Sequence, residues 1–209
     1  RRRHTRCLSD WSSDVCSSDL GILRQLATIG PDDAPRLIEG VQHQNGLRRL
    51  DDPRRPELGV RVLTPAGQAG KMLGLPEAPL ADYEALRLSL GVPDGSRDLP
   101  VEKALLLESG FDELNGVDWK KGCYMGQELT ARTKYRGLVK KRLFPVKVEG
   151  ALPAPGTAIE RNGEEVGEIR SGAGNRALAM LRLEALEGAL TAGGARIVPQ
   201  KPDWMKLPD

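Results

Sequence analysis

The chain is poor in the residues that build most catalytic and metal-binding sites. Its 209 residues include three cysteines, two histidines and 4% aromatic residues. The cysteines at positions 7, 16 and 123 follow no metal-ligand spacing, and an odd number without a secretory signal favours a reducing compartment. No apolar run approaches the roughly 18 residues of a membrane-spanning helix. We therefore expect neither a stably bound metal nor a membrane anchor.

The charge is unevenly distributed along the chain. The net charge is only +2, which excludes a polycation. Residues 118–142, however, contain eight basic and two acidic residues, a local net charge of +6. This segment predicts an anionic partner: a phosphate, a polycarboxylate ligand or RNA. The alternative is a solvated basic face near a domain joint.

Residues 1–20 do not resemble the start of a domain. They are rich in Arg, Ser and Asp, without periodicity and without the apolar stretch of a signal peptide. They are similar to translated adapter sequence, so we interpret them as a non-native, disordered tail. Cys7 and Cys16 are then expected to carry no chemistry, and the natural protein is expected to begin further upstream.

The remainder divides into two regions with different patterns. Before residue 140 the apolar spacing predicts a helix over 21–30, a short helix over 34–41, strands at 47–50 and within 59–65, and a clear helix ending at Gly91. For the last helix we expect Asp82 as the cap and an inner face of Tyr83, Leu86, Leu88 and Leu90. After residue 140, short alternating segments and the Asn162-Gly163 hairpin signal predict a small antiparallel β-barrel over 141–209.

Cys123 follows Lys120 and Lys121 and precedes a polar segment that can form a helix over 126–135. The free N–H groups and the positive end of a helix stabilise a thiolate, and Lys120 and Lys121 add to this effect. The sequence therefore predicts a reactive thiol, with Gly122 and Gly126 leaving its flanks open. The alternative is a cysteine packed as a small hydrophobic residue under a loop. A Cys–His hydrolase is not favoured, because His43 shows no reason to pair with Cys123.

The segment around Cys123 resembles the signature of the YgfZ family, K-G-C-[FY]-x-G-Q-E-x-x-[AS]-R-x-x-x-R-G. YgfZ proteins are folate-binding relatives of the glycine-cleavage T-protein, an aminomethyltransferase. The resemblance covers residues 45–205, with looser matches at 83–93, 115–118 and 202–205. The motif residues are Lys121, Gly122, Cys123, Tyr124, Gly126, Gln127, Glu128, Arg132, Arg136 and Gly137.

The resemblance implies an α+β fold, with a partial T-protein-like folate-binding domain over 21–140 before the barrel. It implies a folate-dependent accessory protein for assembly or repair of iron–sulfur clusters in client enzymes, including tRNA-modifying ones. Cys123 would be the critical thiol, tetrahydrofolate or a derivative the cofactor, and client or assembly proteins the partners. The protein would be a monomer without direct nucleic-acid contact, in the cytoplasm or the mitochondrial matrix. Arg132 would contact either the folate carboxylates or Glu128.

The residues alone also allow two other functions. One is an enzyme, a tetrahydrofolate-dependent one-carbon (aminomethyl) transferase of the T-protein type, for which no motif supplies the required carboxylate. The other is a basic RNA-contacting module, for which stacking aromatics near the patch are few. A resident cluster carrier is disfavoured, because one native cysteine is far from the usual four ligands.

Overall fold

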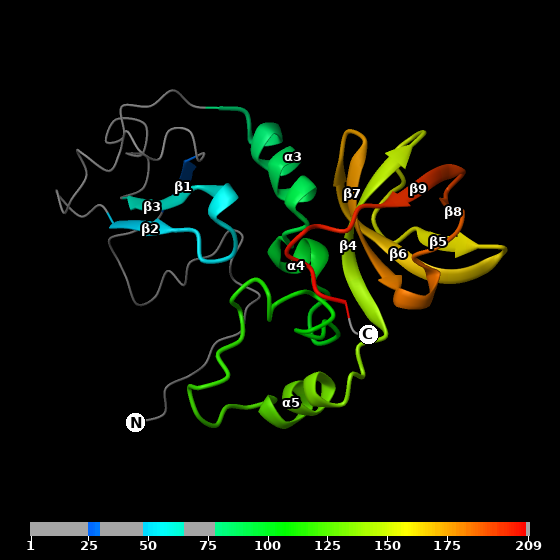
Figure 1. The fold of residues 1–209 in the computed structure, drawn as a ribbon. Coiled ribbons are helices and arrows are strands. Elements are labelled where there is room, and N and C mark those ends of the chain that lie inside the picture. The colour runs from blue at the N-terminus through cyan, green and yellow to red at the C-terminus, as the bar shows by residue number, and fades with distance from the viewer. Residues whose placement is uncertain (1–24, 30–47, 65–77, 208–209) are drawn as a thin grey trace. The chain divides into compact units, whose positions relative to one another are not determined.

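The computed structural model describes residues 25–29, 48–64 and 78–207, and these residues fall into two compact units, 1–80 and 81–209. Figure 1 labels their helices and strands. The barrel occupies the C-terminal part of the second unit, and its first strand begins at Lys141, the first residue of the predicted barrel domain.

The first unit contains a three-stranded antiparallel sheet. Strand β3 (Val60–Thr64) lies between β1 (Gln25–Ile29) and β2 (Arg48–Asp51), and a 3-10 helix at Pro56–Leu58 precedes it. The strands predicted at 47–50 and within 59–65 are thereby confirmed. The helix predicted over 21–30 is wrong where the chain is described, because residues 25–29 pair along their whole length with β3. Pairing with a distant strand outweighs the local apolar spacing. The helix predicted over 34–41 lies outside the described residues.

The second unit begins with α3 (Leu80–Leu90), the helix that the sequence predicts most clearly. It ends at Gly91, whose φ of +73° lies in the left-handed region that favours glycine. A Cβ at this position would come within 3.0 Å of Pro145, so the glycine also permits close approach to the barrel. Asp82 lies inside the helix rather than capping it. The predicted inner face is wrong in part, because the buried side chains are Glu84, Arg87 and Leu88.

Arg87 explains that polar inner face. Its side chain has no exposed surface and donates to Asp98 of α4 (Gly95–Asp98) at 2.8 Å, to Glu84 at 2.8 Å and to the Ser171 hydroxyl at 3.0 Å. The strand register is irregular between Ile169 and Gly172, and there the Ser171 N–H donates to Asp98 instead. Next to this network, Leu88 packs against Leu143 and Leu178. The network therefore ties α3 and α4 to the outside of the barrel.

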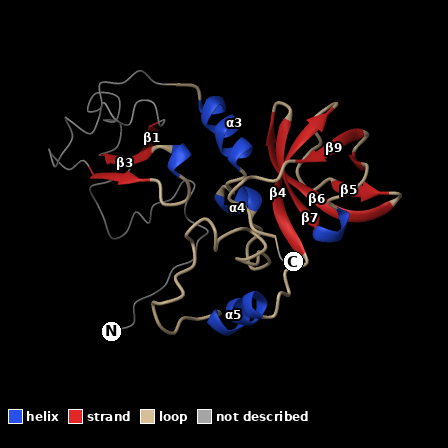
Figure 2. Ribbon diagram, in the orientation of Figure 1, coloured by secondary structure: helices blue, strands red, loops and turns tan. Residues whose placement is uncertain are grey.

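The barrel is closed and antiparallel, with strand order β4-β7-β6-β5-β8-β9. Figure 2 draws its strands in red. Its strands are β4 (Lys141–Glu149), β5 (Ala158–Arg161), β6 (Glu164–Ala173), β7 (Arg176–Arg182), β8 (Leu190–Ala192) and β9 (Ala195–Pro199). A 3-10 helix at Leu183–Ala185 follows β7. The predicted β5–β6 hairpin is confirmed, since Asn162 and Gly163 both have positive φ, the geometry of a type I′ turn. Phe144, Val146, Ile159, Ile169 and Ile197 fill the interior.

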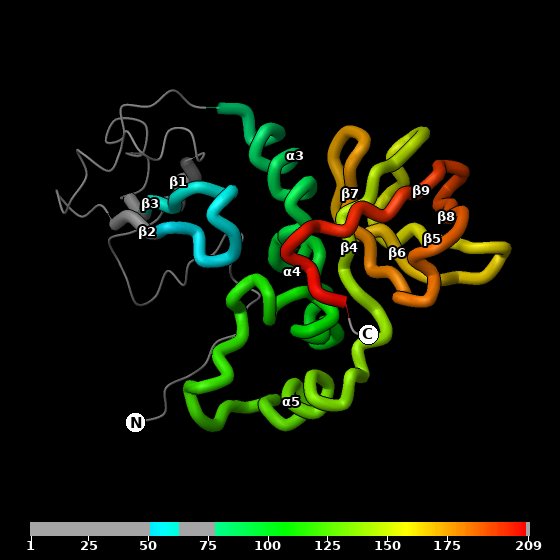
Figure 3. The backbone as a smooth tube through the Cα atoms, viewed as in Figure 1, coloured from blue at the N-terminus to red at the C-terminus, as the bar shows by residue number. Residues whose placement is uncertain are grey.

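The segment after β9 returns to the end of α3 (Figure 3). The Trp204 indole N–H donates to the Leu90 carbonyl at 2.8 Å, although 114 residues separate them. The next residue, Met205, is buried and belongs to the barrel's core cluster. This pair of contacts, here called the C-terminal clasp, joins the beginning and the end of the second unit.

Candidate functional site

The YgfZ-like motif occupies a loop and the helix that follows it, α5 (Gln127–Tyr135), as predicted. Gly122 and Gly126 both have φ of +86°, and Gly126 is the residue preceding the helix. A Cβ at either glycine would meet nothing within 4 Å, so backbone conformation rather than crowding requires glycine there. The Gln127 N–H donates to the Tyr124 carbonyl at 3.2 Å, which closes the turn into the helix.

Cys123 is a free, exposed cysteine three residues before Gly126. The alternative that it is packed under a loop is therefore wrong. Next to it, the Lys121 ammonium lies 4.5 Å from the centroid of the Tyr124 ring. Met125, two residues after Cys123, is 96% exposed, and Leu129 of α5 is 58% exposed, so both the loop and the helix carry exposed apolar side chains. The thiol is accessible to a reagent or to a partner.

The basic residues of the motif differ in their pairing. Arg132 donates to Glu128 at 2.5 Å, one helical turn away, so the internal pair expected as one alternative is the one observed. Other cations are exposed and form no ion pair within the described residues: Lys120, Lys121, Arg136, Lys140 and Lys141. We call these five the free cations. Lys120 and Lys121 lie within three residues of Cys123 in the chain and leave positive charge beside the exposed thiol, whereas Arg136, Lys140 and Lys141 follow α5.

Two residues outside the motif, Asp112 and Trp119, hold α5 in place. The Asp112 carboxylate accepts from Lys134 of α5 at 2.7 Å and from the Trp119 indole at 2.6 Å. Lys134 also lies 4.1 Å from the centroid of the Trp119 ring, which packs edge-on against Tyr135. Burial raises the pKa of Asp112, but the hydrogen bonds from Lys134 and Trp119 and the Lys134 charge outweigh it and hold the pKa below 3.8. The carboxylate therefore stays ionised at neutral pH.

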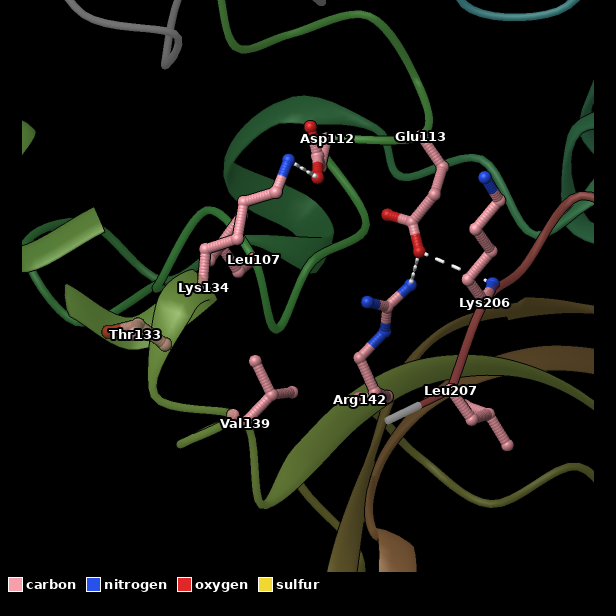
Figure 4. A pocket seen from close by; sticks show the side chains of 10 residues that line it. Leu107, Asp112, Glu113, Thr133, Lys134, Val139, Arg142, Lys206 and Leu207 are labelled. Atoms are coloured by element: carbon pink, nitrogen blue, oxygen red, sulfur yellow. Dashed lines mark hydrogen bonds and ion pairs between the residues drawn. The ribbon is translucent and has the colours of Figure 1, made fainter. Parts of the chain in front are cut away.

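A pocket of about 380 Å³ lies against the inner side of α5 (Figure 4). Its floor includes the ion pair between Arg142 of β4 and Glu113, 2.8 Å apart and almost fully buried. The other lining residues come from α5 and the segments on either side of it and from the C-terminal segment: Leu107, Asp112, Thr133, Lys134, Gly137, Val139, Lys206 and Leu207. Of the motif residues, Gly137 belongs to this lining.

The sequence therefore predicts the motif loop and α5 but misses the groups around them. Gly122, Cys123, Gly126, Glu128, Arg132 and Arg136 lie together on the loop and helix, with all six exposed, whereas Tyr124 and Gln127 are half-buried. Arg142 belongs to the predicted basic segment but is buried against Glu113. Its partner lies 29 residues away, and no local pattern indicates that pairing.

The fold of the chain is similar to that of a solved structure. The chain is similar to the glycine cleavage system aminomethyltransferase T from Bartonella henselae, with a TM-score of 0.54 and 14% identity. The likeness covers 82% of this chain and 56% of that chain. Residues 140–207 match the family model described as CAF17, C-terminal beta-barrel domain. The predicted fold class, an aminomethyltransferase-like α+β fold with a C-terminal antiparallel barrel, is confirmed.

The sequence relatives are more specific. The chain is 44% identical over 174 residues to the mouse protein named iron-sulfur cluster assembly factor IBA57, mitochondrial, and 44% identical over 169 residues to the human one. Each match covers 74% of this chain and 46% of the relative. A homologue from Neurospora crassa is 42% identical over 121 residues, 56% of this chain and 28% of that protein. The chain spans about half the length of the mouse and human relatives.

Proposed function

We propose that the chain is a folate-dependent accessory protein for assembly or repair of iron–sulfur clusters in client enzymes, tRNA-modifying ones among them. We place it with the YgfZ proteins and the CAF17 and IBA57 relatives. The observation that carries the proposal is the 44% identity with two proteins named as iron–sulfur cluster assembly factors. The motif around Cys123 lies on an exposed loop, where it is accessible to partner proteins.

Cys123 is the proposed reactive group. An exposed thiolate can ligate iron, but it supplies one of the usual four protein ligands of a cluster. A cluster in transit would then be held jointly by Cys123 and a partner protein. The apolar side chains of Met125 and Leu129, together with the free cations, would contact that partner. The proposed partners are thus client or assembly proteins, which the chain would bind as a monomer.

Tetrahydrofolate is the proposed cofactor. The described residues fit its acidic end, because Arg136 and Lys121 are exposed cations without an ion pair, and guanidinium groups bind carboxylates well. Arg132 is engaged by Glu128 and is less suited to this role. Arg136→Ala is expected to weaken tetrahydrofolate binding, whereas Arg176→Ala, at an exposed barrel arginine, should leave it unchanged. Fluorescence titration would measure both, and equal affinities would contradict the role of Arg136.

The mouse and human relatives are named as mitochondrial, which supports the mitochondrial matrix over the cytoplasm as the proposed location. Within the described ranges, no helix has the length and apolarity required to span a membrane.

The test is rescue by a chimera. Residues 45–205 would replace the corresponding part of the mouse relative in cells lacking that protein, and activities of [4Fe–4S] enzymes would be measured. The chimera should restore them, and Cys123→Ser should abolish the rescue. The control is Arg176→Ala in the chimera, at an exposed barrel residue outside the motif, which should leave the rescue intact. Failure of the unmodified chimera, or full rescue by Cys123→Ser, would refute the proposal.

A further inference from the structure

The pocket beside α5 has the dimensions and lining of a small-molecule site. Its volume of about 380 Å³ falls within the range of about 300–1,000 Å³ typical of ligand pockets. Leu107, Val139 and Leu207 supply apolar surface, and charged groups lie among them. The walls come from the 107–113 segment, α5, β4 and the C-terminal segment, so an occupant would contact four parts of the second unit.

One acceptor in this pocket has no donor. The Glu113 Oε1 atom accepts from Arg142 at 2.8 Å and from the Lys206 backbone N–H at 3.4 Å. The Oε2 atom is buried and accepts from no group within the described residues. Figure 4 shows this second oxygen pointing away from Arg142, toward the side of Leu107 and Lys134. A buried carboxylate oxygen without a donor is costly, so a ligand N–H there would be stabilising.

One donor in the same pocket also has no partner. The Arg142 side chain is only 5% exposed, and its Nη2 atom is occupied by Glu113. Its Nε atom is buried and donates to no group in the described part of the chain. Two pocket-lining side chains that contact each other thus hold an unused acceptor and an unused donor just beneath the pocket surface. An amide group has the complementary pair, an N–H and a C=O.

The charges in the pocket do not cancel. Asp112 neutralises Lys134, and Glu113 neutralises Arg142. Lys206, which also lines the pocket, forms no ion pair within the described ranges, and its charge lowers the pKa of Asp112 only as a minor contribution beside Lys134. The remaining positive charge favours an anionic group on the ligand, and a carboxylate suits an ammonium at the pocket edge.

We propose that this pocket binds an N-acylated amino acid, a molecule in which an amide group is followed by a carboxylate and an apolar side chain. A small rotation of the two side chains would bring both atoms to the pocket surface. There the amide N–H would donate to Glu113 Oε2, and the amide carbonyl would accept from Arg142 Nε. The carboxylate would lie near Lys206, and the side chain would contact Leu107 and Val139. This site is separate from the exposed motif cysteine and does not depend on the proposed role in cluster assembly.

Two kinds of molecule carry an amide followed by a carboxylate and an apolar side chain: a free N-acyl amino acid and the carboxyl end of a peptide chain. N-acetyl-leucine represents the first, and an acetylated pentapeptide ending in leucine represents the second. Binding of N-acetyl-leucine alone identifies a small-molecule site. Binding of both, with the pentapeptide at least as tight, identifies a site for a carboxyl terminus. Either result supports the proposal.

The experiment is a calorimetric titration of the full chain with these probes. For N-acetyl-leucine we expect a Kd on the order of 1 mM. N-acetyl-leucinamide lacks the carboxylate, and 5-methylhexanoate lacks the amide; each should bind about tenfold more weakly. Because the pocket walls include α5, N-acetyl-leucine should also slow amide hydrogen exchange in residues 127–135.

Two lysine variants complete the test. Lys206→Ala changes an exposed side chain and should raise the Kd of N-acetyl-leucine about tenfold without changing that of the leucinamide. Lys201→Ala, at an exposed lysine of the same C-terminal segment that does not line the pocket, should leave both Kd values unchanged. The proposal is overturned if neither probe binds the parent chain at about 10 mM, a concentration tenfold above the expected Kd. It is also overturned if Lys206→Ala binds N-acetyl-leucine as the parent does.

Discussion

Arg87→Ala is the substitution expected to destabilise the second unit most. Arg87 is fully buried and donates to Asp98, Glu84, Ser171 and the Val92 carbonyl. Burial lowers the pKa of its guanidinium, but the two carboxylates outweigh that effect, so the group remains charged at every relevant pH. Truncation would leave Asp98, whose side chain is also fully buried, without its countercharge.

The magnitude follows from this burial. Removing one partner of a buried ion pair costs about 3–5 kcal/mol, because the remaining charge stays out of water. Asp98 would keep two backbone donors, the N–H groups of Asp94 at 2.7 Å and Ser171 at 3.0 Å. The emptied side-chain volume adds a further cost. We therefore expect the free energy of unfolding to fall by about 3–5 kcal/mol and Tm by about 10 °C.

Urea unfolding followed by tryptophan fluorescence measures this loss, because Trp204 hydrogen-bonds to the end of α3. The matched control is Arg97→Ala. Arg97 pairs with the same Glu84 at 3.1 Å but is 49% exposed, so its loss should cost less than about 1 kcal/mol. If Arg87→Ala costs no more than Arg97→Ala at an unchanged urea dependence, the buried network does not stabilise the unit and the reasoning is wrong.

Three further outcomes are expected. Gly163→Ala places a side chain at φ +83°, which should cost about 1 kcal/mol in thermal unfolding although the added Cβ meets nothing; no loss would contradict the type I′ turn. Burial raises the pKa of Glu108 above 4.5, against a smaller effect of Lys141, so its ionisation weakens the fold as pH rises. Glu108→Gln should therefore be more stable than the parent at pH 7 and lose this advantage below about pH 4, as urea midpoints at both pH values would show. Cys123→Ser changes an exposed residue and should alter stability by less than about 0.5 kcal/mol; a larger loss would assign Cys123 a packing role.

The elements that could be predicted from the sequence are those whose signals are local. The Asn162-Gly163 turn, the alternating barrel strands and α5 follow from turn residues and spacing within a few positions. The wrong predictions concern segments whose structure depends on a residue far away in the sequence. Residues 25–29 have helical spacing but pair with β3, more than 30 residues away. The inner face of α3 is polar because Arg87 meets Ser171, 84 positions away.

The candidate site shows the same limit. The motif residues and the exposed Cys123 are identified by a continuous signature of residues 121–137. The ion pair of Glu113 with Arg142 joins two segments that no signature connects. Arg142 follows two lysines, and no local pattern indicates that it differs from them in burial. In strand β4, however, Arg142 is buried whereas Lys141 is exposed. Burial of a charged side chain depends on the position of its partner, which the local sequence does not contain.

The C-terminal clasp also sets the order of events during synthesis. The Leu90 carbonyl, at the end of α3, accepts its hydrogen bond from Trp204. This bond can form only after 114 further residues have been synthesised. At about 5–20 residues per second, that delay is on the order of ten seconds. Leu88 also lacks its partners at first, because Leu143 and Leu178 follow it in the chain, and until they are synthesised its apolar surface faces water or a chaperone. The second unit therefore folds as a whole only after translation has passed Met205.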